Sequence, residues 1–148
     1  MFATIAAVFC VSVCSFAPSA PAVDTNMNMD GDWKVTLAVD AGLEVTNRFE
    51  RVIYRFKGEN FQYLRDGVVV REYKWTRDER VRPFAMDLKY IGDNAEAKKE
   101  LEKGLKGIYR FVDGRFERCY ANAGMERPKE FESTPKNRFV FMVLERIP

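Results

Sequence analysis

The sequence predicts an all-β fold of seven or eight antiparallel strands with at most one short helix. Apolar and polar residues alternate with period two in most segments after residue 31, which is typical of half-buried strands. Two Asp-Gly pairs separate such segments, and this dipeptide is a strong hairpin signal. Only one segment has helical spacing. A barrel and a two-sheet sandwich both satisfy this pattern, and strand order alone does not separate them.

Composition limits the possible functions. The chain has 148 residues, which suits one domain, and its 24 basic and 22 acidic side chains are interspersed, so no basic stripe indicates a nucleic-acid partner. It contains no histidine, which removes His-dependent catalytic triads and the common His-based zinc sites. Three cysteines are too few for a four-thiolate metal site. We therefore expect no enzyme activity, no cofactor and no metal.

Residues 1–22 have the pattern of a secretory signal peptide. They contain no charged side chain, and the apolar run from Ile5 to Val13 leads to small residues and an Ala20-Pro21-Ala22 cleavage site. The run is too short for a membrane anchor, so we expect no stable membrane insertion. The prediction is export to the periplasm or the extracellular space, with 23–30 as a disordered leader and 31–148 as the folded domain. The alternatives are a mis-set start codon or a cytoplasmic tail.

The first half of the folded domain contains four expected strands. In the first, Trp33, Val35, Leu37 and Val39 share one face, and Gly42 ends the pattern. The others are 52–57, with Tyr54 on its apolar face, then 61–64, and a segment from 68 through 75. Asp66-Gly67 joins the last two as a hairpin.

The second half contains the helical candidate and four more strands. Residues 86–90 alternate around Asp87, and 94–106 is expected to be a short exposed helix or an ordered loop. Strands at 107–112 and 115–121 flank Asp113-Gly114, and a long connection follows over 122–137. Residues 139–144 are all apolar, which indicates a strand buried on both faces.

A set of short motifs is spread over about 31–146, namely Gly31-Asp32-Trp33-Lys34-Val35, Pro83 to Leu88, Gly107-Ile108-Tyr109, Asp113-Gly114, Phe116, Cys119-Tyr120, Arg127-Pro128, Phe131 and Arg146. These motifs carry a resemblance to a lipocalin-like family of uncharacterised secreted bacterial proteins that is expanded in planctomycetes. The resemblance implies a lipocalin-like up-and-down antiparallel barrel of about eight strands, with no established activity, catalytic residue or ligand. Gly31-x-Trp33 also resembles the opening of true lipocalins, which implies that Trp33 packs under Arg146 and closes one end of the barrel.

Other chemically suggestive residues have structural interpretations. Cys119 lacks a histidine to activate it, so a packed thiol is favoured over a nucleophile, an intermolecular disulfide or a redox role. Asp87 is expected to face outward or to cap a turn, and nothing forces it together with Glu126, Glu130 and Glu132 as a carboxylate pair. Arg127 is expected to fix the long connection through backbone carbonyls or an acidic partner.

Any ligand site is expected around Arg118. Alternation places Phe116, Arg118 and Tyr120 on one face of their strand, and Tyr109 and Tyr54 join them as candidates. A buried guanidinium needs a partner, either internal, such as Glu50 or Glu72, or the carboxylate of a lipid-like ligand. The alternative is a register that turns Arg118 to solvent.

Two functions from different classes remain open. One is a barrel that binds a small apolar or acidic lipid-like ligand. The other is a protein-interaction or structural module whose barrel is filled by its own side chains. A cavity of roughly 300 Å³ or more favours the first.

Overall fold

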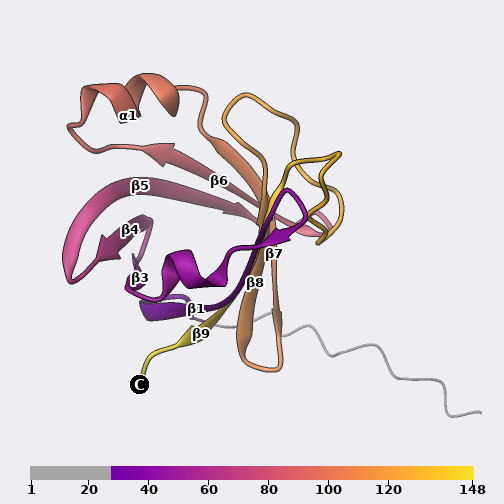
Figure 1. Cartoon of the computed structure of the whole chain (residues 1–148), viewed down its shortest axis with the longest axis horizontal. Helices are drawn as coiled ribbons and strands as arrows, with labels where there is room; N and C mark the ends of the chain where they lie inside the picture. Colours follow the sequence, from indigo (N-terminus) through magenta and orange to yellow (C-terminus); the bar gives the residue numbers. More distant parts are fainter. Residues whose placement is uncertain (1–27) are drawn as a thin grey trace, which may run out of the picture.

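The structure, a computed structural model, describes residues 28–148 and contains a closed eight-stranded antiparallel barrel (Figure 1). The predicted signal peptide and residues 23–27 lie outside the described residues. The barrel strands are β1 (Gly31–Asp40), β3 (Val52–Lys57), β4 (Asn60–Arg65), β5 (Val68–Asp78), β6 (Phe84–Tyr90), β7 (Leu105–Val112), β8 (Arg115–Tyr120) and β9 (Val140–Arg146). A two-residue strand β2 (Leu43–Glu44) pairs antiparallel with the end of β1, and a 3-10 helix η1 (Thr46–Phe49) follows it.

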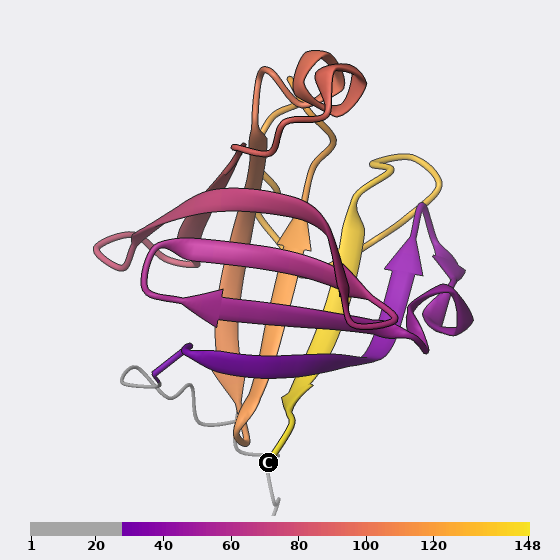
Figure 2. The same cartoon turned by 90° about the vertical axis from the view of Figure 1, so that its left-hand side faces the viewer.

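The topology is up-and-down, which decides between the barrel and the sandwich. Each barrel strand pairs antiparallel with the next, and β1 closes the sheet by pairing with β9 from Trp33 opposite Arg146 to Asp40 opposite Val140. Strands β3 to β5 cross β7 to β9 at a steep angle (Figure 2), as the tilt of a closed barrel requires. The predicted fold class is confirmed.

Both Asp-Gly pairs form the predicted hairpin turns. Asp66 and Gly67 have φ angles of 54° and 77°, and Asp113 and Gly114 have φ angles of 51° and 75°. Positive φ at both central residues defines the type I′ turn, whose twist matches the twist of the flanking strands. These turns set the β4–β5 and β7–β8 connections.

The predicted set of inward-facing residues of β1 is wrong beyond the middle of the strand. Val35 pairs with Leu144 and Leu37 with Val143, so Thr36 is an extra residue that bulges from the ladder. A bulge shifts the alternation by one position. Ala38 is therefore buried, whereas Leu37 and Val39, expected beside Trp33, are only half-buried.

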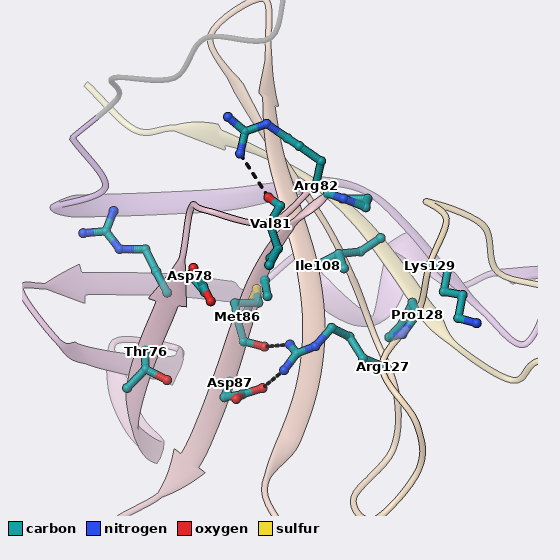
Figure 3. Close-up of a pocket in the computed structure, with 13 residues that line it drawn as sticks. Thr76, Asp78, Val81, Arg82, Met86, Asp87, Ile108, Arg127, Pro128 and Lys129 are labelled. Atoms are coloured by element: carbon teal, nitrogen blue, oxygen red, sulfur yellow. Dashed lines mark hydrogen bonds and ion pairs between the residues drawn. The ribbon is translucent and has the colours of Figure 1, made fainter.

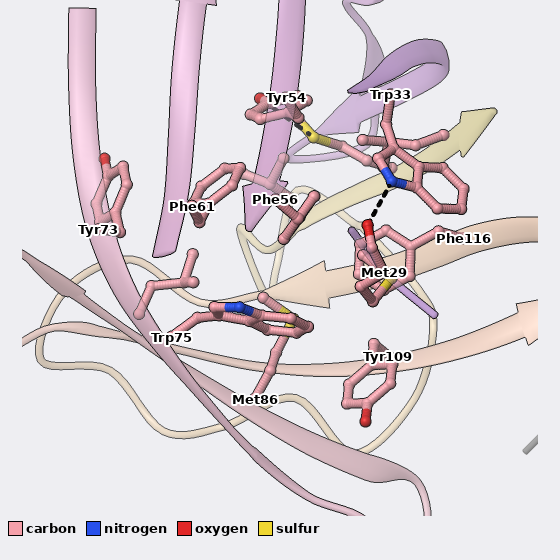
Figure 4. Close-up of a cluster of buried hydrophobic side chains, with 14 of the residues drawn as sticks. Met29, Trp33, Tyr54, Phe56, Phe61, Tyr73, Trp75, Met86, Tyr109 and Phe116 are labelled. Atoms are coloured by element: carbon pink, nitrogen blue, oxygen red, sulfur yellow. Dashed lines mark hydrogen bonds between the residues drawn. The ribbon is translucent and has the colours of Figure 1, made fainter. Parts of the chain in front are cut away.

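Aromatic side chains fill one half of the barrel, which we call the closed end (Figure 4). Phe56 stacks on Phe61 with ring centroids 4.8 Å apart and meets Trp75 edge-on at 5.1 Å, while Phe116 lies 6.0 Å from Trp33. Each such ring contributes about 1.5–3 kcal/mol through burial. This cluster accounts for the stability of a domain whose only cysteine among the described residues is the free Cys119.

Trp33 and Arg146 lie together at the closed end. The guanidinium carbon of Arg146 lies 4.6 Å from the centre of the Trp33 ring, and Trp33 Nε1 donates to the carbonyl of Met29 at 2.9 Å. Arg146 also donates to the carbonyls of Asn28 and Asp30. Residues 28–30 therefore pack against the barrel, and Met29 is buried beside the indole of Trp33.

A six-residue helix and a long connection complete the fold. Helix α1 (Ala95–Glu100) begins at Asn94, whose side chain accepts from the Ala97 amide, and it buries Ala97. Leu105, predicted at the end of this helix, already belongs to β7, because Gly104 turns the chain at φ 68°. The long connection lies over β8, where the Cys119 thiol contacts the Glu132 carbonyl at 3.6 Å.

Candidate ligand-binding site

The other half of the barrel, the open end, contains a cavity of about 730 Å³ that is partly open to solvent. This volume lies within the usual range of roughly 300–1,000 Å³ for sites that bind small molecules. Its lining divides by chemistry. The aromatic and charged residues are Asp40, Phe49, Tyr54, Phe61, Tyr63, Arg65, Arg71, Tyr73, Glu100, Arg118 and Tyr120, and the others are Val70, Leu88, Leu101, Leu105, Asn122, Ala123 and Val140.

Arg118 is the charged side chain buried deepest in this cavity. Only 2% of it is exposed, which makes it the one fully buried charged residue of the described chain. Its guanidinium carbon lies 4.5 Å from the centre of the Tyr54 ring, 5.0 Å from that of Tyr120 and 5.5 Å from that of Phe61. The alternative in which Arg118 faces solvent is therefore wrong, and the strand alternation places it inside the barrel as expected.

The guanidinium of Arg118 has no carboxylate partner within residues 28–148. Its Nη2 contacts the Met142 sulfur at 3.3 Å, whereas Nε and Nη1 are buried without any hydrogen-bond partner. The two internal partners considered from the sequence do not reach it, because Glu50 is exposed and Glu72 accepts instead from Gln62 at 2.6 Å. An unsatisfied buried donor costs about 1–3 kcal/mol, so the side chains around Arg118 leave it costly to bury.

Three tyrosines surround Arg118 in their neutral form. Burial raises the pKa of Tyr54, Tyr73 and Tyr120 above the ordinary value of 10, and the positive charge of Arg118 opposes part of this shift. The rings of Tyr54 and Tyr120 face the cation, and attraction of a cation to a ring contributes about 0.5–2 kcal/mol. Neutral hydroxyls can donate hydrogen bonds to an anion but cannot neutralise the guanidinium.

Two of the five predicted ligand residues do not line the cavity. Arg118, Tyr120 and Tyr54 do. Phe116 is two positions nearer the closed end on β8 and packs against Trp33. Tyr109 faces inward opposite Arg118, but its hydroxyl donates to Glu79 at 2.8 Å, so the side chain leans away from the cavity into the filled half.

Sequence reasoning missed several lining residues. Arg71 continues the alternation of Tyr73 and Trp75, so period two alone was enough to place it inside. Asp40 turns inward only because Thr36 bulges, and no pattern in the sequence marks that bulge. Leu101 lies just after α1 and covers the open end through the fold of the chain rather than through any local motif.

A second hollow of about 700 Å³ lies on the outer wall beside β5 and β6 (Figure 3). Its central cation, Arg127, donates to the carbonyls of Met86 and Gly107 at 2.8 and 2.6 Å and to the carboxylate of Asp87 at 2.7 Å. These contacts tie the long connection to β6 and β7. Arg127 thus has both kinds of partner expected from the sequence, and no buried donor is left free there for a ligand.

The remaining predicted residue, Cys119, lies on the outward face of β8 and is completely buried under the long connection. Burial raises the pKa of its thiol to about 11, so the reactive thiolate is scarce at neutral pH. In the described part of the chain, no cluster of His, Cys, Asp or Glu side chains is arranged to hold a metal ion. No helix among residues 28–148 has the length and hydropathy needed to span a membrane.

Comparison with known proteins gives no further assignment. No protein-family model, curated protein or solved structure matches the chain. The resemblance to the lipocalin-like family remains a prediction.

Proposed function

We propose that this protein binds a small amphipathic acid inside the barrel, with the acidic group on Arg118. The observation that carries the proposal is the buried guanidinium whose Nε and Nη1 lack partners at the wall of a 730 Å³ cavity. A buried charge is expensive unless it is paired. A ligand carboxylate supplies the missing partner, because it accepts two parallel hydrogen bonds from the planar fork of an arginine.

The rest of the lining suits an apolar ligand body. Aliphatic and aromatic side chains from β6, β7, β9, η1 and the segment after α1 face the same cavity, namely Leu88, Leu105, Val140, Phe49 and Leu101. Burial of an alkyl chain against such residues gains roughly 25 cal/mol per Å² of apolar surface. The alternative, a structural module with a filled barrel, fits the closed end only. We also propose that the protein acts after export, as residues 1–22 indicate.

The test compares decanoate with decanol, which share a chain and differ in charge. Isothermal titration calorimetry should detect binding of decanoate, and Arg118→Met should weaken it at least tenfold, which is about 1.4 kcal/mol. Arg115→Gln is the matched control, because Arg115 is exposed on the same strand and does not line the cavity. Its affinity for decanoate should stay within about twofold of the wild type.

Three results would overturn the proposal. The first is an absence of decanoate binding, and the second is equal affinity for decanoate and decanol. The third is an Arg118→Met variant that binds decanoate as well as the wild type. The first result would favour the protein-interaction module instead.

A further inference from the structure

Three arginines face the cavity, and none of them pairs with a carboxylate of the described chain. Arg118 is deep, Arg71 is half-buried on β5, and Arg65 is exposed at the end of β4, where it donates to the Tyr63 hydroxyl at 2.8 Å. On the outer wall, by contrast, Arg55, Arg110 and Arg127 each meet an acid at 2.7 Å. These three outer arginines thus have carboxylate partners within ion-pair distance, whereas the three arginines of the cavity have none among residues 28–148.

We propose that the natural ligand carries two anionic groups, one for Arg118 and one for Arg71. This inference rests on the proposed function and names its ligand class, a dicarboxylic acid or an equivalent dianion. Alternation along β5 places Arg71 on the same inward face as Tyr73 and Trp75, and Arg71 is paired with Tyr63 of β4 in the ladder. Its side chain lines the cavity that holds Arg118, so one ligand can reach both cations.

The two acidic residues of the cavity do not replace such a ligand. Asp40 and Glu100 line the same space, yet neither forms an ion pair with Arg65, Arg71 or Arg118. Burial lowers the pKa of Arg71, but the Tyr73 hydroxyl and the charge of Glu100 outweigh that effect and raise it. Glu100 is nevertheless exposed at the end of α1 and makes no ion-pair contact with Arg71. Arginines outnumber acids on the lining by three to two, which favours a ligand with more negative than positive charge.

The experiment measures affinity for α,ω-dicarboxylates from adipate to tetradecanedioate, with monocarboxylates and ω-amino acids of matched chain length. At the best length, the dicarboxylate should bind at least about tenfold more tightly than the monocarboxylate. The ω-amino acid should bind more weakly than either. Affinity should peak at one chain length, because the two arginines are fixed on separate strands.

Variants assign the second anion to Arg71. Arg71→Gln should weaken the dicarboxylate about tenfold and leave the monocarboxylate within about twofold, while Arg118→Met should weaken both. Two results would overturn this inference and leave the proposed function intact. One is that Arg71→Gln changes the affinities for the dicarboxylate and the monocarboxylate equally. The other is that the ω-amino acid binds the wild type more tightly than the dicarboxylate. Failure of every acid to bind would overturn both the inference and the proposed function. Arg115→Gln again serves as the control for a general loss of positive charge.

Discussion

Replacement of Arg118 by methionine should stabilise the ligand-free protein while it removes acid binding. The wild-type guanidinium is buried with Nε and Nη1 unsatisfied, at about 1–3 kcal/mol for each unpaired group. The guanidinium carbon lies 4.5 and 5.0 Å from the ring centres of Tyr54 and Tyr120, and each ring offsets about 0.5–2 kcal/mol of this cost. Replacement of even a buried ion pair by apolar side chains of similar volume is often neutral or stabilising by about 1–4 kcal/mol, and Arg118 lacks the compensating carboxylate of such a pair.

We expect the free energy of unfolding of Arg118→Met to rise by about 1–3 kcal/mol, measured by urea denaturation without ligand. Each kcal/mol should raise the midpoint of thermal unfolding by about 3–6 °C in a domain of this size. Phe116→Leu, on the same strand but in the filled half, should instead lose about 1–2 kcal/mol through its cavity. If Arg118→Met instead lowers the free energy of unfolding by about 1 kcal/mol or more, the prediction is wrong, because the guanidinium then stabilises the fold.

Three other predictions address the closed end, the thiol and the leader. Arg146→Met removes the contact with Trp33 and the bonds to the carbonyls of residues 28 and 30, so urea denaturation should show a loss of about 1–3 kcal/mol, and unchanged stability would contradict the role of this pair. In protein that lacks residues 1–22, Cys119 should stay reduced, and the protein should run as a monomer on non-reducing gels. Its alkylation should increase only as the pH rises toward about 11, whereas the urea-unfolded chain, with an ordinary thiol pKa of about 9, should react near that pH; fast labelling of the folded protein at neutral pH would contradict burial. N-terminal sequencing of the exported protein should begin at Val23 or within a few residues, and recovery of intact Met1 outside the cytoplasm would exclude cleavage.

The strands and hairpins were predictable because their signals are local. Alternation over 52–57 buries Val52, Tyr54 and Phe56 as expected, and the two Asp-Gly pairs set both tight hairpins. The bulge at Thr36 was not predictable, because it depends on how β1 meets β9 across the whole chain. The packing of residues 28–30 against the barrel was not predictable for a similar reason. Met29 stands between two polar residues, and its segment is held by bonds from Trp33 and Arg146, which lies far away in the sequence.

The candidate site was predictable in part. Alternation gave the inward direction of Arg118, but which groups lie beside it depends on β3 and β9, which are far away in sequence. The absence of an acid at this position could not be deduced, because Glu72 looked available until its register with Gln62 was known. Arg71 carried a signal in the period-two pattern of β5 that was enough to include it.

Native mass spectrometry of the protein purified from its own host tests the central claim most directly. We expect a bound small acid that survives gentle ionisation of the wild type and is missing from Arg118→Met. Fragmentation of the released adduct should show two acidic groups, whereas a single acidic group would support the site at Arg118 alone and contradict the second site at Arg71. A wild-type protein that carries no adduct, or an adduct retained equally by Arg118→Met, would contradict the claim that the buried guanidinium of Arg118 exists to bind an acid.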